Sequence, residues 1–404
     1  MPRLPAILPI VLVTLGACGA STGLPEVGTV EVVGGDGQRG LTGVPLPDST
    51  VLRVTDDRGR PMAGVEVTWA AEPDDRVSPS AVATDLDGTA RALWTLGPEP
   101  GVDTLVARVD GHTVVYLAEA VAARAGEAWR GRNDYVEYYP GDLPLVLSAP
   151  HGGRDMPAEI ADRTEGTMVR DVNTELLVLA AADALEAELG GRPHVIRALI
   201  HRRKVDLNRD IVEAAQGDPL AEQAWLEFHG FVEHARRRVE ADHGRGFYVD
   251  IHGHGHEIQR IELGYLLNAG ELGLSDEALD DPALAAETSI RTLAAESGMS
   301  LSALLRGGLS LGTLLEAEGF PAVPSAEQPD PGTAPYFSGG YNTARHGSLD
   351  GGPIDGVQAE LNRIGVRDTA ASRAAFAAAL ARAMATYLAE HYDFRPAPAA
   401  PSGS

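Results

Sequence analysis

The sequence predicts a multidomain protein: an all-β sandwich, followed by an α/β domain with a mixed or largely parallel sheet. The 404 residues, 44% of them apolar, suffice for roughly two to three domains with a sizeable core. Short apolar runs separated by turn signals fill residues 30–122, which is typical of a sandwich. Strand-like and helical runs then alternate over residues 130–395, which predicts an α/β domain.

Residues 1–17 have the pattern of an export signal. Arg3 precedes an apolar run of about 12 residues, which is shorter than the roughly 20 needed to span a bilayer as a helix. The run ends in Leu15-Gly16-Ala17-Cys18, which resembles a bacterial lipoprotein signal, in which the cysteine receives a lipid. We therefore expect a lipid anchor at Cys18, a tether over residues 18–29 and a place in the cell envelope, outside the cytoplasm. An ordinary signal peptide with a chance cysteine is the alternative.

Charge and cysteine content exclude several classes of protein. The chain has 33 basic and 58 acidic residues, a net charge of −25, so it lacks the basic surface that a nucleic-acid partner requires. Cys18 is the single cysteine, which excludes a disulfide framework and a cysteine-based zinc site. Any metal must therefore be held by histidine and carboxylate side chains. The sequence does not predict the oligomeric state.

Six strands are predicted in the first domain, with turn signals such as Asp85-Leu86-Asp87-Gly88 between them. The segments 54–65 and 84–90 resemble bacterial immunoglobulin-like domains of the invasin type, which serve as spacers or adhesive modules. The predicted strands are Val30–Val33, Val51–Thr55, Val65–Trp69, Thr89–Leu96, Thr104–Val109 and Thr113–Ala118.

The second domain alternates strands with long helices. Gly190-Gly191 predicts the end of the first helix, and the Pro- and Ala-rich residues 396–404 are predicted to form a mobile tail. The predicted strands are Leu143–Ser148, His194–Ile200, Phe247–Ile251, Ile261–Leu267 and Gly356–Leu361, and the predicted helices are Asn173–Leu189, Leu220–Val239 and Ala370–His391.

Histidines follow two of these strands, where ligands bind in open α/β sheets. His151 follows one strand, and His252-Gly253-His254-Gly255-His256 follows another. Glycines let such a segment bend tightly, so the three histidines of 252–256 could approach one point, and zinc accepts such nitrogen ligands. We expect His151 and His252 to be the first two ligands and Asp171 the third, with Glu165 and Glu175 as alternatives. The histidines could instead form a solvated loop, and Asp171 could instead be the N-cap of the following helix.

Other polar residues near strand ends suit the remaining roles. Glu360, an acid in a strand-like run, is the candidate general base, and an ion pair with Arg363 or Arg209 is the alternative. Asp250 could orient an imidazole ring by hydrogen bonding.

The segment His201–Arg209 carries four cations in an acidic protein, which suits a substrate carboxylate or a developing oxyanion. We expect Arg203 and Arg209 to act in catalysis, and Asn208 and Arg209 to bind the substrate. A basic surface loop is the alternative. Tyr341, after Gly339-Gly340, could cover the substrate as a flexible loop closes, or anchor an ordinary turn.

In order along the chain, these motifs resemble the N-formylglutamate amidohydrolase family, with its zinc-carboxypeptidase-like architecture. The resemblance rests on Pro150–Gly153, Asp171–Leu176, Asp206–Arg209, Asp250–Gly253 and Gly339–Tyr341 together with Gln358-Ala359-Glu360. It implies a hydrolase of an amide C–N bond, with one Zn²⁺ per chain on His151, Asp171 and His252, Glu360 as general base, and Asn208 and Arg209 on a substrate carboxylate.

The chain departs from the family at two motifs. It has Pro-His-Gly-Gly where Pro-His-Ser-Gly is commoner, and His-Gly-His-Gly-His where a single His-Ser is usual. The expected substrate is therefore broad: an N-acyl amino acid, a peptide or another small molecule with a carboxylate. Carboxypeptidase-like peptide trimming and a catalytically inactive adhesion lipoprotein are the alternatives.

Overall fold

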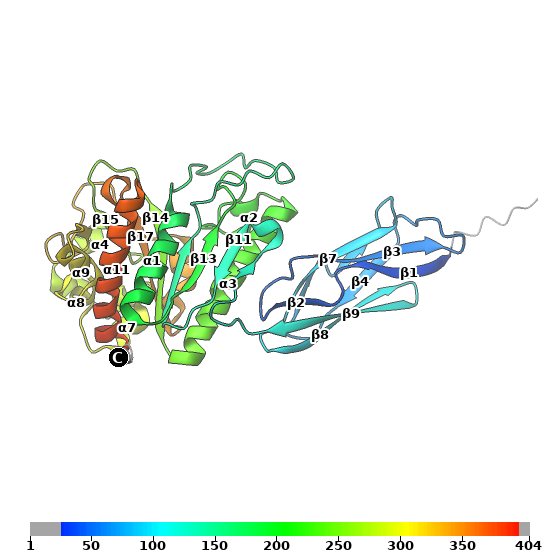
Figure 1. The fold of residues 1–404 in the computed structure, drawn as a ribbon, viewed down its shortest axis with the longest axis horizontal. Coiled ribbons are helices and arrows are strands. Elements are labelled where there is room, and N and C mark those ends of the chain that lie inside the picture. Colours follow the sequence, from blue (N-terminus) through cyan, green and yellow to red (C-terminus); the bar gives the residue numbers. More distant parts are fainter. Residues whose placement is uncertain (1–25, 396–404) are drawn as a thin grey trace, which may run out of the picture.

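A computed structural model describes residues 26–395 as a β-sandwich and an α/β region placed end to end (Figure 1). The predicted fold class is confirmed. The predicted signal segment with Cys18 and the predicted tail 396–404 lie outside the described residues. Within residues 26–395, no helix has both the length and the apolar character needed to cross a membrane.

The sandwich has two sheets, with strand orders β1-β3-β7-β5 and β2-β9-β8-β4-β6. Its longest pairing joins β8 and β9 antiparallel, and all six predicted strands are present, with ends at most three residues from those expected. The strands are β1 Val27–Gly34, β2 Gln38–Leu41, β3 Thr50–Asp56, β4 Glu66–Ala70, β5 Arg76–Ser78, β6 Ala81–Ala83, β7 Thr89–Thr95, β8 Gly101–Val109 and β9 His112–Val121.

Side chains that alternate along the strands form the sandwich core. In β7, Ala90, Ala92 and Trp94 are buried while the residues between them are partly or fully exposed, as expected of a strand with one face inward. Trp69 of β4 and Tyr116 of β9 contact each other across the same core, with ring centroids 5.7 Å apart. The sandwich therefore has its own core and needs no disulfide.

The α/β region contains one eight-stranded sheet of order β10-β11-β13-β12-β14-β17-β15-β16. Its centre is parallel: β12 pairs with β13 and β14, and β14 pairs with β17. Its flanks are antiparallel at the β11–β13 and β15–β17 pairs, so the sheet is mixed. The strands are β10 Trp129–Arg130, β11 Val136–Tyr139, β12 Leu145–Ala149, β13 His194–Ala198, β14 Gly246–Gly253, β15 Ile261–Gly264, β16 Ala322–Val323 and β17 Ile354–Leu361.

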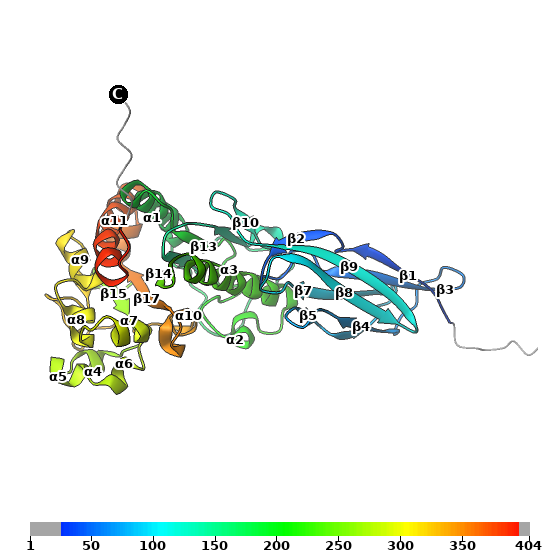
Figure 2. The same ribbon diagram turned by 90° about the horizontal axis from the view of Figure 1, so that it is seen from below.

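Long helices cover both faces of this sheet. The helices α1 (Thr174–Leu189) and α11 (Ala370–His391) pack together on one face, and α3 (Pro219–His243) covers the other (Figure 2). The α3 helix begins where Asp218 accepts hydrogen bonds from two N–H groups of its first turn, and it ends at Gly244. Buried side chains fill the space on both sides, which fixes the strand ends that carry the polar residues.

Short helices complete the region. Those between residues 269 and 317 lie at the end of the region that carries β15 (Figure 2), and α9 contacts β16. The short helices are α2 Ile211–Ala215, α4 Ala269–Leu272, α5 Asp276–Leu279, α6 Pro282–Ala285, α7 Arg291–Glu296, α8 Leu301–Arg306, α9 Leu311–Ala317 and α10 Tyr341–His346, with 3₁₀ turns at Arg132–Asp134 and Ser348–Asp350 and a π-helical turn at Arg363–Arg367.

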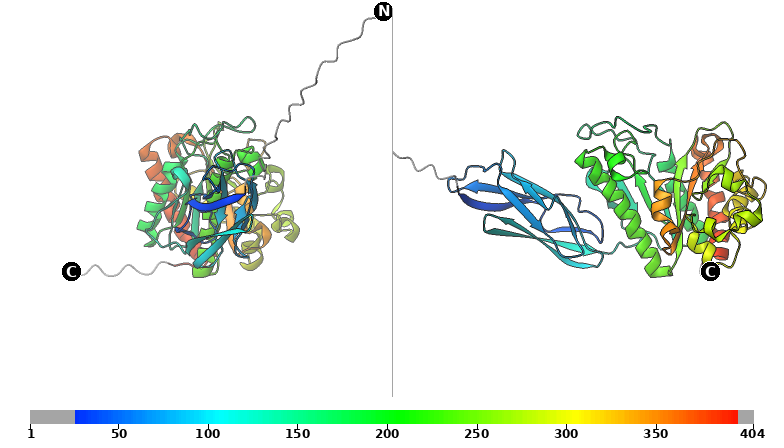
Figure 3. Two further views of the ribbon diagram at one scale, coloured as in Figure 1. Left: turned by 90° about the vertical axis from the view of Figure 1, so that its right-hand side faces the viewer. Right: turned by 180° about the vertical axis from the view of Figure 1, so that it is seen from behind.

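The sandwich packs against α3, which lies between it and the sheet (Figure 3). His234 of α3 is buried there, and its Nε2 accepts a hydrogen bond from the Ala123 N–H (3.1 Å). Its Nδ1 therefore carries the proton and donates to the Thr42 carbonyl (3.1 Å), to which Arg237 also donates (2.9 Å). These bonds hold the segments after β2 and β9 to one helix.

Buried Glu227 of α3 makes stability depend on pH. Burial raises its pKa to about 7. Hydrogen bonds from the Arg132 N–H and the Gln223 amide favour the charged form but do not outweigh the burial. The folded state thus binds a proton that the unfolded state loses near pH 4.5, so this group makes unfolding easier as pH rises from 4.5 to 7.

We expect Glu227→Gln to remove this loss. Relative to the original chain, its free energy of unfolding should rise by on the order of 3 kcal/mol between pH 4.5 and pH 8. Denaturant unfolding at the two pH values measures this difference. An equal difference between variant and original at both pH values would contradict the assignment.

Candidate metal centre

The candidate site lies at the carboxyl ends of the three central parallel strands. His151 follows β12, and His252 and Glu360 lie at the ends of β14 and β17. His252 and Glu360 are register partners, so their side chains leave the same face of the sheet next to each other. The parallel sheet thus brings together residues that are separated by up to 209 positions in the chain.

His151, Asp171 and His252 form one buried group. The Asp171 Oδ2 lies 3.1 Å from His252 Nδ1 and 3.5 Å from His151 Nδ1, and the two imidazole rings have centroids 4.8 Å apart. All three side chains are buried, and their nitrogen and oxygen atoms lie within 4.8 Å of one another, close enough to share one metal ion.

The other nitrogen of each imidazole is held by a carboxylate. His151 Nε2 lies 2.7 Å from Asp206 Oδ1, and His252 Nε2 lies 2.7 Å from Asp250 Oδ2. Asp206 is held in turn by Arg202 (2.9 Å), and Asp250 by a hydrogen bond from Ser148. Carboxylates on the outer nitrogens fix the ring orientation and direct both Nδ1 atoms toward Asp171.

This arrangement fits a bound metal ion. His151 Nδ1 is buried and has no hydrogen-bond partner within residues 26–395, although burying such an atom without a partner is costly. Burial opposes the ionisation of Asp171, but the two neighbouring imidazole rings outweigh it and hold its pKa well below the usual range. Two imidazole nitrogens and a carboxylate are a donor set that zinc accepts.

The Asp250 carboxylate gives a test that leaves the three donor atoms in place. We expect Asp250→Asn to weaken metal binding roughly 10- to 100-fold, because the amide holds the His252 ring less well than the carboxylate does. Competition with a chromophoric chelator measures the affinity. Asp142→Asn, at a carboxylate outside the site, is the control and should keep the original affinity. Equal affinities in both variants would contradict a role for Asp250.

Glu360 is the buried acid of the site. Burial raises its pKa to about 8, and the Gln358 amide donates to its Oε1 (3.0 Å). The carboxyl therefore gains or loses a proton near neutral pH, as a group that moves protons in a reaction must. Neither Arg363 nor Arg209 forms an ion pair with it among the described residues.

The three possible metal ligands and Glu360 line a cavity of about 310 Å³, here called the site cavity. Asn208 and Arg209 line it, as do Arg170 and Arg202. Arg202 is bound to Asp206, whereas Arg209 makes only a half-exposed ion pair with Glu213 (3.0 Å). Such a surface pair is worth little, so the Arg209 guanidinium can exchange it for another carboxylate.

Two expectations and one alternative differ from the structure. Arg203 is half-exposed near Asp162 and does not line the site cavity; the neighbouring Arg202 does, because the turn after β13 points alternate side chains in different directions. The Tyr341 ring packs near His229 (centroids 5.7 Å apart) outside the site cavity, and Gly339 and Gly340 form the wall instead. Asp171 is not the helix cap.

Asn173 occupies the N-cap position of α1, and the Asp171 carboxylate accepts instead from the Gly253 N–H (3.2 Å). The alternatives for the third ligand lie elsewhere. Glu175 pairs with Arg154 (3.2 Å), and Glu165 is exposed.

The three histidines of 252–256 do not converge on one point. His254 and His256 form a second group with Glu262, separate from the group that contains His252. His254 Nε2 donates to the Arg260 carbonyl (2.8 Å) and its Nδ1 accepts from the His256 N–H (3.1 Å), so both nitrogens are already used. His256 Nδ1 lies 2.8 Å from Glu262. This second group is held by its own hydrogen bonds.

Buried Arg367 supports the loops of the site and was not predicted. It donates to the carbonyls of Leu361 (3.0 Å) and His254 (3.1 Å), and also to that of Val172. A Cβ atom on Gly253 would lie 2.2 Å from the Arg367 guanidinium carbon, so the glycine is required by this contact. The glycine after His252 was visible in the sequence, but Arg367, the residue that it contacts, is 114 positions away and could not be identified from it.

Comparison with known proteins gives partial similarities only. No protein-family profile and no curated protein sequence matches this chain. Among solved structures, N-formylglutamate amidohydrolase from Ralstonia eutropha JMP134 is 13% identical with a TM-score of 0.40, covering 62% of this chain and 94% of its own.

Two fragments resemble about a quarter of the chain. The D00-D0 domain of intimin is 17% identical with a TM-score of 0.19, and S-layer protein SbsC domains 4 and 5 are 18% identical with a TM-score of 0.20. Each covers 24% of this chain, and this chain spans 46% and 54% of them, respectively. At these identities and TM-scores, the similarities assign no activity.

Proposed function

We propose that this chain is a zinc-dependent amidohydrolase that cleaves the amide C–N bond of an N-acyl amino acid or a related carboxylate-bearing substrate. One observation carries the proposal: His151 Nδ1, buried and without a hydrogen-bond partner, faces the ionised Asp171 and the matching Nδ1 of His252. The sequence motifs that resemble the N-formylglutamate amidohydrolases supply the bond type.

His151, Asp171 and His252 would hold the zinc through Nδ1, Oδ2 and Nδ1. A zinc ion there supplies Lewis acidity, which polarises an amide carbonyl and favours loss of a proton from water. Glu360 accepts that proton on its carboxylate as the water oxygen bonds to the carbonyl carbon. When the C–N bond breaks, Glu360 returns the proton to the leaving nitrogen, so the products are a carboxylic acid and an amine.

The arginines of the site cavity would bind the substrate carboxylate. Arg209 has a weak, half-exposed partner, and Arg170 donates one hydrogen bond to the Gly152 carbonyl (2.9 Å). Guanidinium groups bind carboxylates through paired hydrogen bonds, so either group can orient a substrate that bears one. Asn208 lies between this wall and the zinc ligands, with its Nδ2 3.4 Å from His252 Nε2.

A substrate panel tests the function. The zinc-loaded protein is assayed on N-formyl and N-acetyl amino acids and on peptides with free C-termini, before and after chelation and zinc return. The proposal expects hydrolysis of N-acyl amino acids that is lost on chelation and restored by zinc. Cleavage of the peptides alone would favour the carboxypeptidase-like alternative. No hydrolysis of either class by folded, zinc-loaded protein would favour an inactive adhesion protein.

We further propose that the chain is anchored by a lipid at Cys18 in the cell envelope. The described chain starts at the end of the sandwich that lies away from the α/β region, so the sandwich can act as a spacer (Figure 1). Growth with labelled fatty acid should label the chain, and Cys18→Ser should abolish the label. Label retained by the variant would contradict the anchor.

A further inference from the structure

A second cavity lies where the sandwich meets α3. It has a volume of about 440 Å³ and shares no lining residue with the site cavity; here it is called the junction cavity. Both parts of the chain form its walls: Arg76 and Thr95 come from the sandwich, Arg237 from α3 and Arg345 from α10. Its size falls within the usual range of pockets for small ligands.

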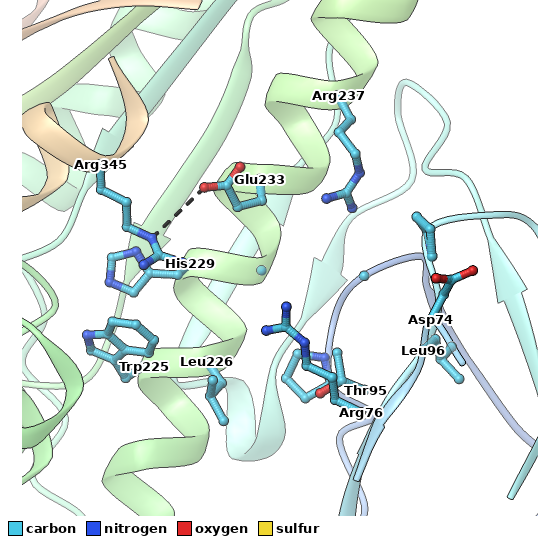
Figure 4. A pocket seen from close by; sticks show the side chains of 14 residues that line it. Asp74, Arg76, Thr95, Leu96, Trp225, Leu226, His229, Glu233, Arg237 and Arg345 are labelled. Carbon is cyan, nitrogen blue, oxygen red and sulfur yellow. Dashed lines mark ion pairs between the residues drawn. The ribbon is translucent and has the colours of Figure 1, made fainter. Parts of the chain in front are cut away.

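Two guanidinium groups face each other across the junction cavity. Figure 4 shows Arg76 of β5 and Arg237 of α3 pointing toward each other from opposite walls. Within residues 26–395, neither forms an ion pair with a carboxylate. Arg237 donates one hydrogen bond, to the Thr42 carbonyl (2.9 Å). The exposed Asp74 also lines this cavity but forms no ion pair with either arginine among the described residues. In a chain with a net charge of −25, two cations without an ion-pair partner therefore lie on one cavity.

The nearest buried acid does not neutralise them. Glu233 is bound by Arg236 (2.8 Å) and by His346 Nδ1 (3.0 Å), and Arg345 lies farther away at 3.9 Å. Burial opposes its ionisation, but the bond from His346 outweighs it and lowers the pKa of Glu233 to about 2. Its charge is therefore already matched by Arg236 and His346, although Glu233 also lines the junction cavity.

Arg237 is half-buried, and this burial lowers its pKa. A guanidinium removed from water without a counter-charge is unfavourable, and an anion between the two forks would relieve this cost. Guanidinium groups match the oxygen atoms of carboxylates and phosphates in pairs. The remaining wall is mixed. Pro45, Leu96 and Trp225 offer apolar contacts to an organic group attached to the anion, and Thr95 and His229 are polar.

We propose that the junction cavity binds a small organic anion through its carboxylate or phosphate group, held between Arg76 and Arg237. The ligand would bridge the sandwich and the α/β region, because each part supplies one of the two guanidinium groups. This site does not depend on the proposed hydrolase activity, since it uses other residues and another cavity.

Calorimetric titration of the full chain tests this proposal, with succinate and inorganic phosphate as probes and sodium chloride at matched ionic strength. We expect saturable binding of at least one probe, weakened roughly tenfold or more in Arg76→Gln and Arg237→Gln. Preferred binding of succinate indicates a carboxylate ligand, and preferred binding of phosphate indicates a phosphate ligand.

Two controls separate this site from others. Arg108→Gln removes an exposed arginine of β8 outside the junction cavity, and Arg209→Gln removes one from the site cavity. Both should keep the binding that Arg76→Gln weakens. Because Arg237 also supports the junction, the exposed Arg76 gives the decisive variant if Arg237→Gln unfolds. No binding of either probe, or binding that Arg76→Gln leaves unchanged, would overturn the proposal.

Discussion

Glu360→Gln is expected to lower kcat/KM about 10²- to 10⁴-fold while the zinc stays bound. The amide has the shape of the carboxyl group and can still contact Gln358, but it cannot accept a proton from water. Burial raises the pKa of Glu360 to about 8. Glu360 acts as a base only when it is ionised, so kcat/KM of the original enzyme should rise with pH. A nearby divalent cation favours the ionised carboxylate and shifts this rise to lower pH.

Steady-state kinetics across pH 5 to 9, with metal analysis of each sample, measures both effects. The Glu227→Gln variant is the matched control, because Glu227 is also a buried acid with a raised pKa but lies outside the site cavity. It should keep the pH–rate profile of the original chain. A Glu360→Gln enzyme that keeps the rise with pH and most of its rate would exclude Glu360 as the base.

His151→Ala and Asp171→Ala are expected to lower bound zinc from about one ion per chain to nearly none. Each removes one of three donors, and the remaining two cannot hold the ion tightly. Both residues lie outside the hydrophobic cores of the α/β region, so the fold should persist. Elemental analysis after dialysis gives the stoichiometry, and circular dichroism confirms the fold.

His254→Ala is the matched control for these ligand variants. It removes a buried histidine from the same strand end, two residues from His252. The nitrogens of His254 bond to the Arg260 carbonyl and the His256 N–H, so they are not expected to hold the ion. The control should keep about one zinc per chain. Loss of zinc in His254→Ala with full retention in His151→Ala would place the ion in the second histidine group.

The sequence predicted the fold well where periodicity was strong. The β7 strand alternates cleanly, and α11 has the expected ends at Ala370 and His391, because their hydrophobic patterns match their burial. The short strands β5 and β6 and the small helices between residues 269 and 317 were not predicted. Segments of three to seven residues give too few positions for a period, and their conformation depends on packing.

Of the candidate site, the residues at the ends of strands could be predicted from the sequence. His151, His252 and Glu360 follow recognisable strands, so a parallel sheet brings them together. The partners of these residues were harder to find: Asp206 binds His151 across 55 positions, and Arg202 lines the site cavity in place of Arg203. A loop's side-chain directions depend on its contacts in the fold, and one sequence carries no record of them.

A crystal structure of the zinc-loaded chain, with anomalous diffraction measured at the zinc edge, tests the central claim most directly. We expect one strong peak per chain, enclosed by His151 Nδ1, His252 Nδ1 and Asp171 Oδ2. A peak at His254, His256 and Glu262 instead, or no peak in crystals grown with zinc, would contradict it.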